Sequence, residues 1–150
     1  MRIHNPPERK AKPMIWNGWR FRSQAEAYAA MFLHKIGVEF DFECEGYALD
    51  GGEPTRPDFW LPEIDGGAWL EIKGHDAFDD RQVRRLSEEH GDVPLYVAIA
   101  PLWTRASNGR DTNSMLLYRR GRRLDVQHEF TRCARCRSWT IQYRGWQSKH

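Results

Sequence analysis

Apolar residues recur at helical spacing near the start of the chain. They lie three or four positions apart, which places them on one face of a helix. These residues are Ala25, Ala29, Phe32, Leu33 and Ile36. Ser23 and Glu26 match a capping box, which marks the start of a helix, and Gly37 is typical of a helix end. We therefore predict a helix over residues 23–36.

A strictly alternating segment follows this helix. From residue 38 to residue 45 each apolar residue is followed by an acidic one, as in a strand with one buried face. The apolar residues are Val38, Phe40, Phe42 and Cys44, and the acidic ones are Glu39, Asp41, Glu43 and Glu45. Two more strands are predicted over residues 56–61 and 68–73, joined by a turn at Asp65-Gly66-Gly67. The three strands would form a meander.

The rest of the pattern completes an α/β fold. A helix is predicted over residues 77–90, and the strand over residues 95–100 is apolar throughout, as expected at the centre of a sheet. The order predicts an αβββαβ core with a mixed central sheet flanked by helices. This core would occupy residues 14–101, beginning with a hairpin at Asn17-Gly18. A flexible arm, residues 1–13, would precede it. A basic extension, residues 102–150, would follow, with short strands over residues 114–118, 124–130 and 138–143.

The composition is that of one polar domain. Hydrophobic residues make up 40% of the 150 residues, and the mean hydropathy is −0.78. No apolar run approaches the roughly 20 residues that span a membrane, and the first 13 residues contain no secretion signal. Three cysteines do not make a disulfide framework. We expect a cytoplasmic protein, of a bacterium or a phage-infected cell, with no membrane partner.

Charge is distributed unevenly along the chain, although the net charge is only +2. Between residues 38 and 80 the only basic residues are Arg56 and Lys73, whereas residues 102–150 are rich in arginine. This asymmetry favours a polyanionic partner at one end and metal-binding carboxylates at the other. Ordinary surface charge explains the counts equally well.

Three charged residues would converge on the second and third strands of the meander. Asp58 follows Pro57, and Glu71 and Lys73 would point to the same face of their strand, about 6.5–7 Å apart. Two carboxylates supply the hard oxygen ligands that magnesium takes alongside water and a phosphate. An ammonium nearby can position the attacking water or stabilise charge on the phosphate. Phosphodiester hydrolysis requires these parts.

Pro57-Asp58 followed by Glu71-Ile72-Lys73 resembles the PD-(D/E)XK, or restriction-endonuclease-like, nuclease superfamily. The segment from Phe21 to Glu26 is similar to its first-helix motif, in which a glutamate completes the site. The resemblance covers about residues 16–100, and the predicted order of elements matches the family's αβββαβ core. It implies a DNA endonuclease dependent on Mg²⁺ or Mn²⁺.

The resemblance also implies roles for individual residues. Asp58 and Glu71 would bind the metal, together with the Ile72 carbonyl. Lys73 would orient or deprotonate the attacking water, and Glu26 would hold a second metal or a water beside the first. The pattern is similar to that of phage-type Holliday-junction resolvases, which act as dimers, so branched DNA and a homodimer are expected from this resemblance.

A structural role is the alternative at each of these positions. Glu26 could serve only the capping box, Asp58 only a turn, and Glu71 with Lys73 only a cross-strand charge pair. Weaker candidates for the site are His75, Asp76 and Gln82.

Arginines and aromatic residues of the second half indicate a DNA-binding surface. Four arginines surround a predicted turn at Gly121, and the helix over residues 77–90 carries others on its outer face. The expected phosphate contacts are Arg84, Arg85, Arg119, Arg120, Arg122 and Arg123. The alternative is a solvated hairpin tip.

Cys133 and Cys136 form half of a zinc-ribbon signature. Tetrahedral zinc needs four ligands, so His128 and His150 would have to complete the site. Two ordinary thiols are the alternative. Two further functions therefore stand beside the endonuclease: a nuclease-like module that binds nucleic acid without cutting it, and a zinc-dependent interaction protein.

Overall fold

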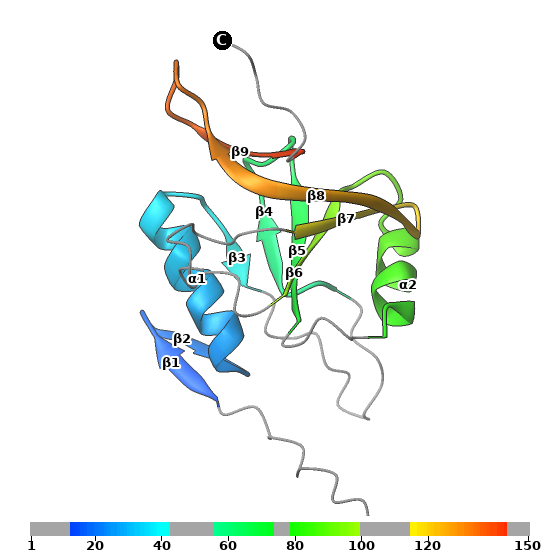
Figure 1. Cartoon of the computed structure of the whole chain (residues 1–150). Helices are drawn as coiled ribbons and strands as arrows, with labels where there is room; N and C mark the ends of the chain where they lie inside the picture. The colour runs from blue at the N-terminus through cyan, green and yellow to red at the C-terminus, as the bar shows by residue number, and fades with distance from the viewer. Residues whose placement is uncertain (1–12, 43–55, 74–78, 100–114, 144–150) are drawn as a thin grey trace, which may run out of the picture.

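The computed structural model describes residues 13–42, 56–73, 79–99 and 115–143. The helices and strands, in chain order, are β1 (Met14–Trp16), β2 (Trp19–Phe21), α1 (Gln24–Ile36), β3 (Asp41–Phe42), β4 (Phe59–Leu61), β5 (Ala68–Lys73), α2 (Arg81–Glu89), β6 (Leu95–Ile99), β7 (Met115–Arg119), β8 (Arg122–Arg132) and β9 (Trp139–Tyr143). Figure 1 shows a curled sheet between the two helices.

Seven strands form one mixed sheet in the order β3-β4-β5-β6-β7-β8-β9. Only β5 and β6 pair in parallel, and α2 makes the crossover between them; the other neighbours are antiparallel. β1 and β2 form a separate hairpin around Asn17-Gly18, whose φ angles of 49° and 78° are those of the predicted turn. The predicted α/β character and mixed sheet are confirmed.

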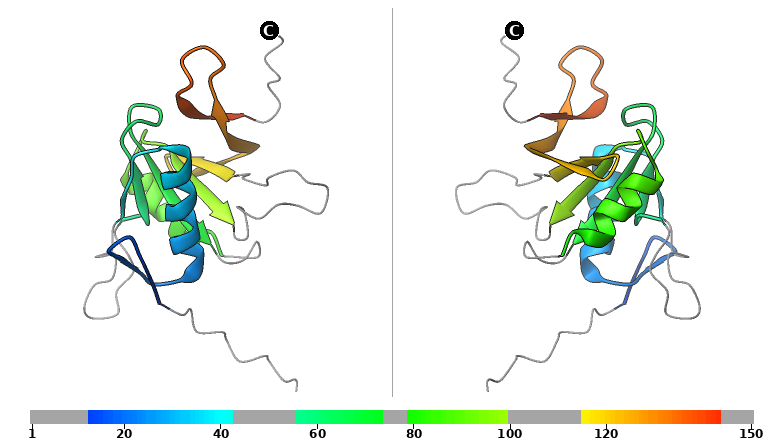
Figure 2. Two further views of the ribbon diagram at one scale, coloured as in Figure 1. Left: turned by 90° about the vertical axis from the view of Figure 1, so that its left-hand side faces the viewer. Right: turned by 90° about the vertical axis from the view of Figure 1, so that its right-hand side faces the viewer.

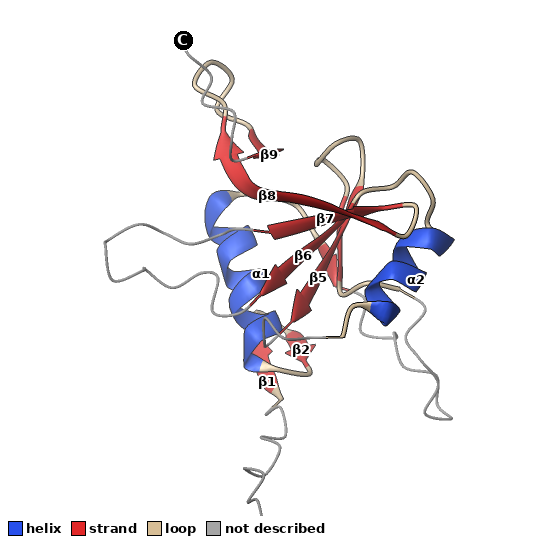
Figure 3. Ribbon diagram, turned by 45° about the vertical axis from the view of Figure 1, so that its right-hand side comes forward, coloured by secondary structure: helices blue, strands red, loops and turns tan. Residues whose placement is uncertain are grey.

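The two helices cover opposite faces of the sheet. Side chains alternate along a strand, so Leu70 and Ile72 of β5 belong to the core that includes Leu33 of α1. Val97 of β6 belongs to a second core with Leu86 of α2. Figure 2 shows α1 in front in one view and α2 in front in the other, and Figure 3 shows the sheet between them. Helix α1 thus buries its apolar face against the sheet on the β5 side, and α2 buries its own against β6, β7 and β8.

Helix α1 begins and ends as the sequence predicts, but its buried face is wider. The Ser23 hydroxyl accepts the Glu26 N–H, and Gly37 takes a left-handed conformation with φ of 76°. Besides the expected Ala29 and Leu33, the helix buries Ala27 and Ala30. Both the β1–β2 hairpin and β5 lie against α1, so the helix buries residues on more than one side.

The second strand of the predicted meander is shorter than expected. β4 starts at Phe59 rather than at residue 56, because the backbone N–H of Ile72 is bonded to the Asp58 carboxylate. The turn before β5 follows the sequence prediction. Gly67 has a φ of 123°, and a Cβ there would lie 2.6 Å from the Trp60 ring, so no other residue fits without rearrangement.

The strands predicted in the C-terminal extension are present as β7, β8 and β9, and they continue the same sheet. Met115, Leu117, Phe130 and Ile141 belong to the core on the α1 face. The first meander strand, predicted from residue 38, begins only at Asp41, although exposed and less exposed side chains alternate over residues 38–42 as expected. Its remainder, including Cys44, lies outside the described residues. In the part of the chain that the structure describes, neither helix has the length and apolar character needed to cross a membrane.

Candidate active site

Asp58 lies at the centre of a charged cluster, at the point where β4 and β5 separate. Phe59 pairs with Leu70, so Asp58 precedes β4 at the level of Glu71. Its Oδ2 accepts the backbone N–H of Ile72 at 2.8 Å, and its Oδ1 accepts from Arg22 Nη2 at 2.9 Å. Asp58 is only 5% exposed. Its carboxylate is therefore held between two strands and the start of α1.

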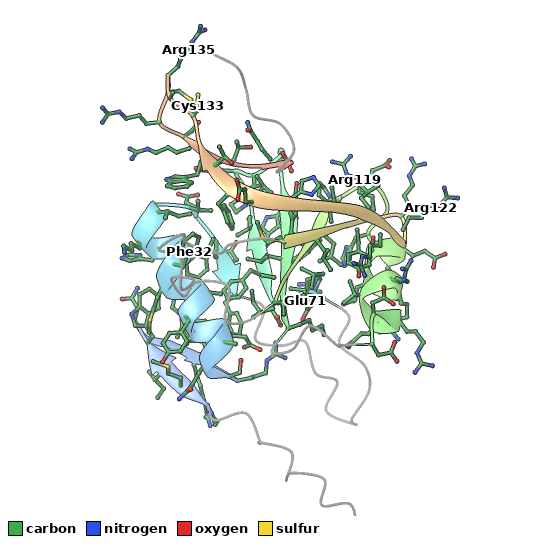
Figure 4. The ribbon with its side chains drawn as sticks, viewed as in Figure 1. Phe32, Glu71, Arg119, Arg122, Cys133 and Arg135 are labelled. Atoms are coloured by element: carbon green, nitrogen blue, oxygen red, sulfur yellow. The ribbon has the colours of Figure 1, made fainter. Side chains whose placement is uncertain are left out.

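Glu71 and Lys73 share one face of β5, as the alternation of the strand predicts. Lys73 Nζ lies 3.9 Å from Glu71 Oε1. Glu71 is buried, whereas Lys73 is partly exposed and lies at the carboxyl end of the strand. In Figure 4 the Glu71 label marks this end of the sheet. The ammonium is thus placed between the buried carboxylates and solvent.

Glu26 reaches the cluster from the first turn of α1. It is buried, and its Oε2 accepts the backbone N–H of Arg22 at 3.2 Å. The Ser23 hydroxyl accepts the Glu26 N–H at 3.2 Å, so half of the predicted capping box is present. The carboxylate itself bonds the residue before the cap. Glu26 therefore takes part in the bonds at the start of α1 and also lies close to Asp58.

Burial and mutual repulsion raise the pKa of two carboxyl groups in this cluster. For Glu26, burial and then the charge of Asp58 raise the pKa from 4.5 to about 7, against the opposing effect of Arg22. For Glu71, burial, the charge of Asp58 and a hydrogen bond with Asp58 hold the pKa well above its usual range, against Lys73 and Arg22. Burial is the larger cause for both groups, and the charge of Asp58 adds to it.

The buried carboxyl groups bear on the predicted metal. The described residues contain no group of three or more His, Cys, Asp and Glu side chains arranged to hold a metal ion. Asp58 and Glu71 nevertheless offer two carboxylates in contact, and magnesium often takes only one or two, with water and phosphate as the other ligands. A divalent cation would relieve the repulsion that raises the pKa of Glu71. The pair fits such a cation, and Arg22 contacts both Asp58 and Glu26.

Arg22 is the site residue that the sequence interpretation missed. Besides its bond to Asp58, its Nε lies 3.6 Å from Glu26 Oε1, and its guanidinium lies 5.9 Å from the centre of the Phe42 ring. The spacing of four residues between Arg22 and Glu26 was not a helical pairing signal, because Arg22 precedes Ser23, the N-cap of α1. The bond to Asp58 had no signal in the sequence, since 36 positions separate the two residues.

The structure does not bring the arginines around Gly121 to this cluster. Lys73 pairs with Ile99 at one end of β6, whereas Tyr118 pairs with Leu95 at the other end. Glu71 pairs with Val97, so the turn at Arg120 and Gly121 lies about four positions farther along the strands and two strands across, roughly 15 Å from the Glu71 backbone. Figure 4 shows Arg119 and Arg122 at the turn between β7 and β8, away from Glu71.

Several predicted DNA contacts are engaged within the protein. Arg120 donates to both carboxylate oxygens of Asp92, at 2.6 and 2.9 Å. Arg84 bonds Asp80 at 2.8 Å and lies over the ring of Tyr118. Arg85 lies 3.9 Å from Glu89, next to Gln82 in a surface hollow of about 500 Å³. The predicted turn is confirmed, with Arg120 and Gly121 at φ of 50° and 73°, and Arg120 and Arg84 fasten it to α2.

Cys133 and Cys136 lie in the exposed turn between β8 and β9. Arg137 N–H bonds the Cys133 carbonyl at 3.0 Å, and Cys136 Sγ lies 2.8 Å from the Ser138 hydroxyl. Hydrogen bonds from Ser138, and then one from Cys133, lower the pKa of the Cys136 thiol from 9.0 to about 7. Neither cysteine is in a disulfide.

His128 is not brought to these thiols. It is buried in β8, five residues before Cys133, and its ring meets that of Tyr96 edge-on at 5.8 Å. The other ligand predicted for zinc, His150, lies outside the described residues, as do His75 and Asp76. The described part of the chain therefore supplies two thiols at the turn and does not bring together the four predicted zinc ligands.

Comparison of the chain with protein-family models, with characterised proteins and with solved structures found no match.

Proposed function

We propose that this protein is a metal-dependent DNA endonuclease with a PD-(D/E)XK core. One observation carries the proposal: Asp58 lies opposite Glu71 where β4 and β5 separate, and Lys73 follows Glu71 on the same face. The order from α1 to β6, with its parallel β5–α2–β6 crossover, also fits the αβββαβ arrangement of that superfamily. Glu26 of α1 adds a third carboxylate beside Asp58.

The side chains suit hydrolysis of a phosphodiester. A divalent cation held by Asp58 and Glu71 would supply positive charge where negative charge develops on the phosphate. Lys73, at the open end of β5, would hold the attacking water or donate to a phosphate oxygen. The main-chain N–H of Ile72 fixes one oxygen of Asp58, so the carboxylate needs no reorganisation during the reaction. Glu26 would orient a water next to Asp58.

DNA bound at the carboxylates would have to extend along the sheet to meet the arginine turn. A duplex rises about 3.4 Å per base pair, so a separation of roughly 15 Å corresponds to four or five base pairs. Arg119 and Arg122 are exposed there and point away from the sheet. These two arginines would add affinity for the backbone without sequence preference.

A non-catalytic nucleic-acid-binding module is the second candidate. It is favoured by Arg22, because a guanidinium already bonded to Asp58 neutralises a carboxylate that an active nuclease would give to a metal. A module of this kind would bind DNA equally well in Mg²⁺ and in EDTA, and would not cut it. A zinc-dependent interaction protein would instead need the turn cysteines for partner binding.

The test is incubation of the purified protein with plasmid, linear, single-stranded and four-way-junction DNA, in Mg²⁺, Mn²⁺ and EDTA. The proposal predicts cleavage of at least one substrate with either metal and none in EDTA. Preferential cutting of the junction, by a protein that sediments as a dimer, would support a resolvase-like substrate. Metal-independent binding to all four substrates without cleavage would instead support the binding module.

A further inference from the structure

Arg22 contacts both Asp58 and Glu26. Its Nη2 donates to Asp58 Oδ1 at 2.9 Å, and its Nε lies 3.6 Å from Glu26 Oε1. The backbone of Arg22 is anchored separately, because its N–H bonds Glu26 Oε2 at 3.2 Å. The backbone of Arg22 is therefore fixed, while its guanidinium bridges two of the carboxylates that are proposed to serve the metal.

The two oxygens of Asp58 differ in how easily they can be released. Oδ2 accepts the main-chain N–H of Ile72, whose position is fixed by the pairing of β5 with β6. Oδ1 is held by the end of a long side chain that is 26% exposed, and a side chain of this kind can rotate. A divalent cation and a guanidinium on the same carboxylate oxygen would repel each other strongly in a buried site. Metal entry and the Arg22–Asp58 bond therefore compete.

A displaced Arg22 guanidinium would stay near the site, because its backbone is held by Glu26 and its side chain packs against Phe42. The planar guanidinium fork binds phosphate oxygens in pairs. A DNA phosphate arriving at Asp58 and Glu71 would bring negative charge within reach of that fork. The arginine would exchange one anion for another.

We propose that Arg22 occupies the place of the cation in the metal-free protein, holding Asp58 and Glu26, and that it moves to a phosphate of the bound DNA when a divalent cation takes Asp58. This inference rests on the proposed function. It makes Arg22 both a competitor of the metal and a ligand of the substrate. A purely structural arginine would be neither, and its loss would weaken metal binding together with DNA binding and stability.

The test is Mn²⁺ binding to the DNA-free protein, followed by electron paramagnetic resonance, for wild type, Arg22→Gln and Arg22→Lys. The matched control is Arg20→Gln, which alters an exposed arginine of β2 two residues away. Removal of the competing charge should tighten Mn²⁺ binding about tenfold in Arg22→Gln. DNA binding in Ca²⁺ should weaken about tenfold in the same variant, and Arg20→Gln should match the wild type in both measurements.

Mn²⁺ affinity in a folded Arg22→Gln protein that equals or falls below that of the wild type overturns the inference, as does undiminished DNA binding in Ca²⁺. A melting curve in EDTA shows whether each variant is folded. Where Arg22→Gln does not fold, Arg22→Lys gives the same readout: its ammonium lacks the planar fork that fits a carboxylate and competes less well for Asp58, so Mn²⁺ should still bind more tightly than in the wild type. A wild-type protein that binds no Mn²⁺ at all would instead contradict the proposed function.

Discussion

At the scale of the single residue, a substitution of Lys73 distinguishes a catalytic role from simple neutralisation of Glu71. It lies 3.9 Å from Glu71 and is partly exposed. If the ammonium acts on the attacking water or on the phosphate, Lys73→Ala should lower the Mg²⁺-dependent cleavage rate at least about a hundredfold. DNA affinity should change little, because other cations contribute most of the phosphate contacts.

Both quantities are measured side by side, by single-turnover cleavage and by a binding titration in Ca²⁺. Lys73→Arg should restore little activity, because the guanidinium fork does not reproduce a compact ammonium. Lys35→Ala, at an exposed position of α1, is the matched control. A Lys73→Ala protein that cuts at a near-normal rate would remove the lysine from the mechanism, and joint loss of binding and cutting would indicate a docking role.

The sequence was sufficient to single out the carboxylates but not all of their partners. The strand period predicted that Glu71 and Lys73 share a face, and the turn before β5 predicted that Asp58 lies near them. The bond from Arg22 to Asp58 could not be predicted, because it depends on how the start of α1 docks against the sheet. The burial that raises the pKa of Glu26 to about 7 has the same origin.

At the scale of the element, the arginines of the turn between β7 and β8 have two different roles, one structural and one proposed for DNA binding, which the sequence does not distinguish. Arg120 is bonded to Asp92 beyond the end of α2, whereas Arg119 and Arg122 are exposed. We predict that Arg119→Ala with Arg122→Ala weakens DNA binding and reduces the salt slope by about two, one per phosphate contact, with no change in melting temperature.

Arg120→Ala supplies the comparison. It should lower the melting temperature slightly, since an exposed ion pair contributes little, and it should leave the salt slope close to that of the wild type. Affinities are measured between about 50 and 200 mM salt. Equal salt slopes for the double variant and the wild type would remove the turn from the DNA-binding surface.

The ends of helices and strands could be predicted where capping and turn residues determine them. They could not be predicted where a hydrogen bond from a distant side chain determines them. Ser23 and Gly37 delimit α1, and Gly67 delimits β5, as their sequence context predicts. β4 is shorter than its sequence suggests because the Asp58 carboxylate takes the N–H of Ile72. That same bond fixes Asp58, so the error in the prediction coincides with the candidate site.

At the scale of the whole molecule, the buried carboxyl groups link stability to pH. Glu26 has a pKa of about 7 in the folded protein and an ordinary value of 4.5. Between these values the folded state holds a proton that the unfolded chain has lost, so this contribution to stability is present below about pH 4.5 and is lost as the pH rises through about 7. Glu71, with its pKa raised, acts in the same direction.

We therefore predict that the melting temperature in EDTA falls between pH 5 and pH 8, and that Glu26→Gln makes this fall smaller because glutamine does not titrate. The exposed Glu39→Gln is the matched control and should behave as the wild type. Calorimetry at both pH values measures the difference. A fall as large in Glu26→Gln as in the wild type would mean that Glu26 is ionised in the folded protein across this range.

The central claim is that Asp58 holds a metal used to cut DNA, and plasmid cleavage tests it most directly. Wild type, Asp58→Asn and the matched control Asp41→Asn, exposed on the neighbouring β3, are compared at equal concentration in Mg²⁺ and in EDTA. Wild type and Asp41→Asn should cut in Mg²⁺ only, and a folded Asp58→Asn should not cut at all. Cleavage by Asp58→Asn at the wild-type rate, or equal cleavage by the wild type in EDTA, would contradict the account.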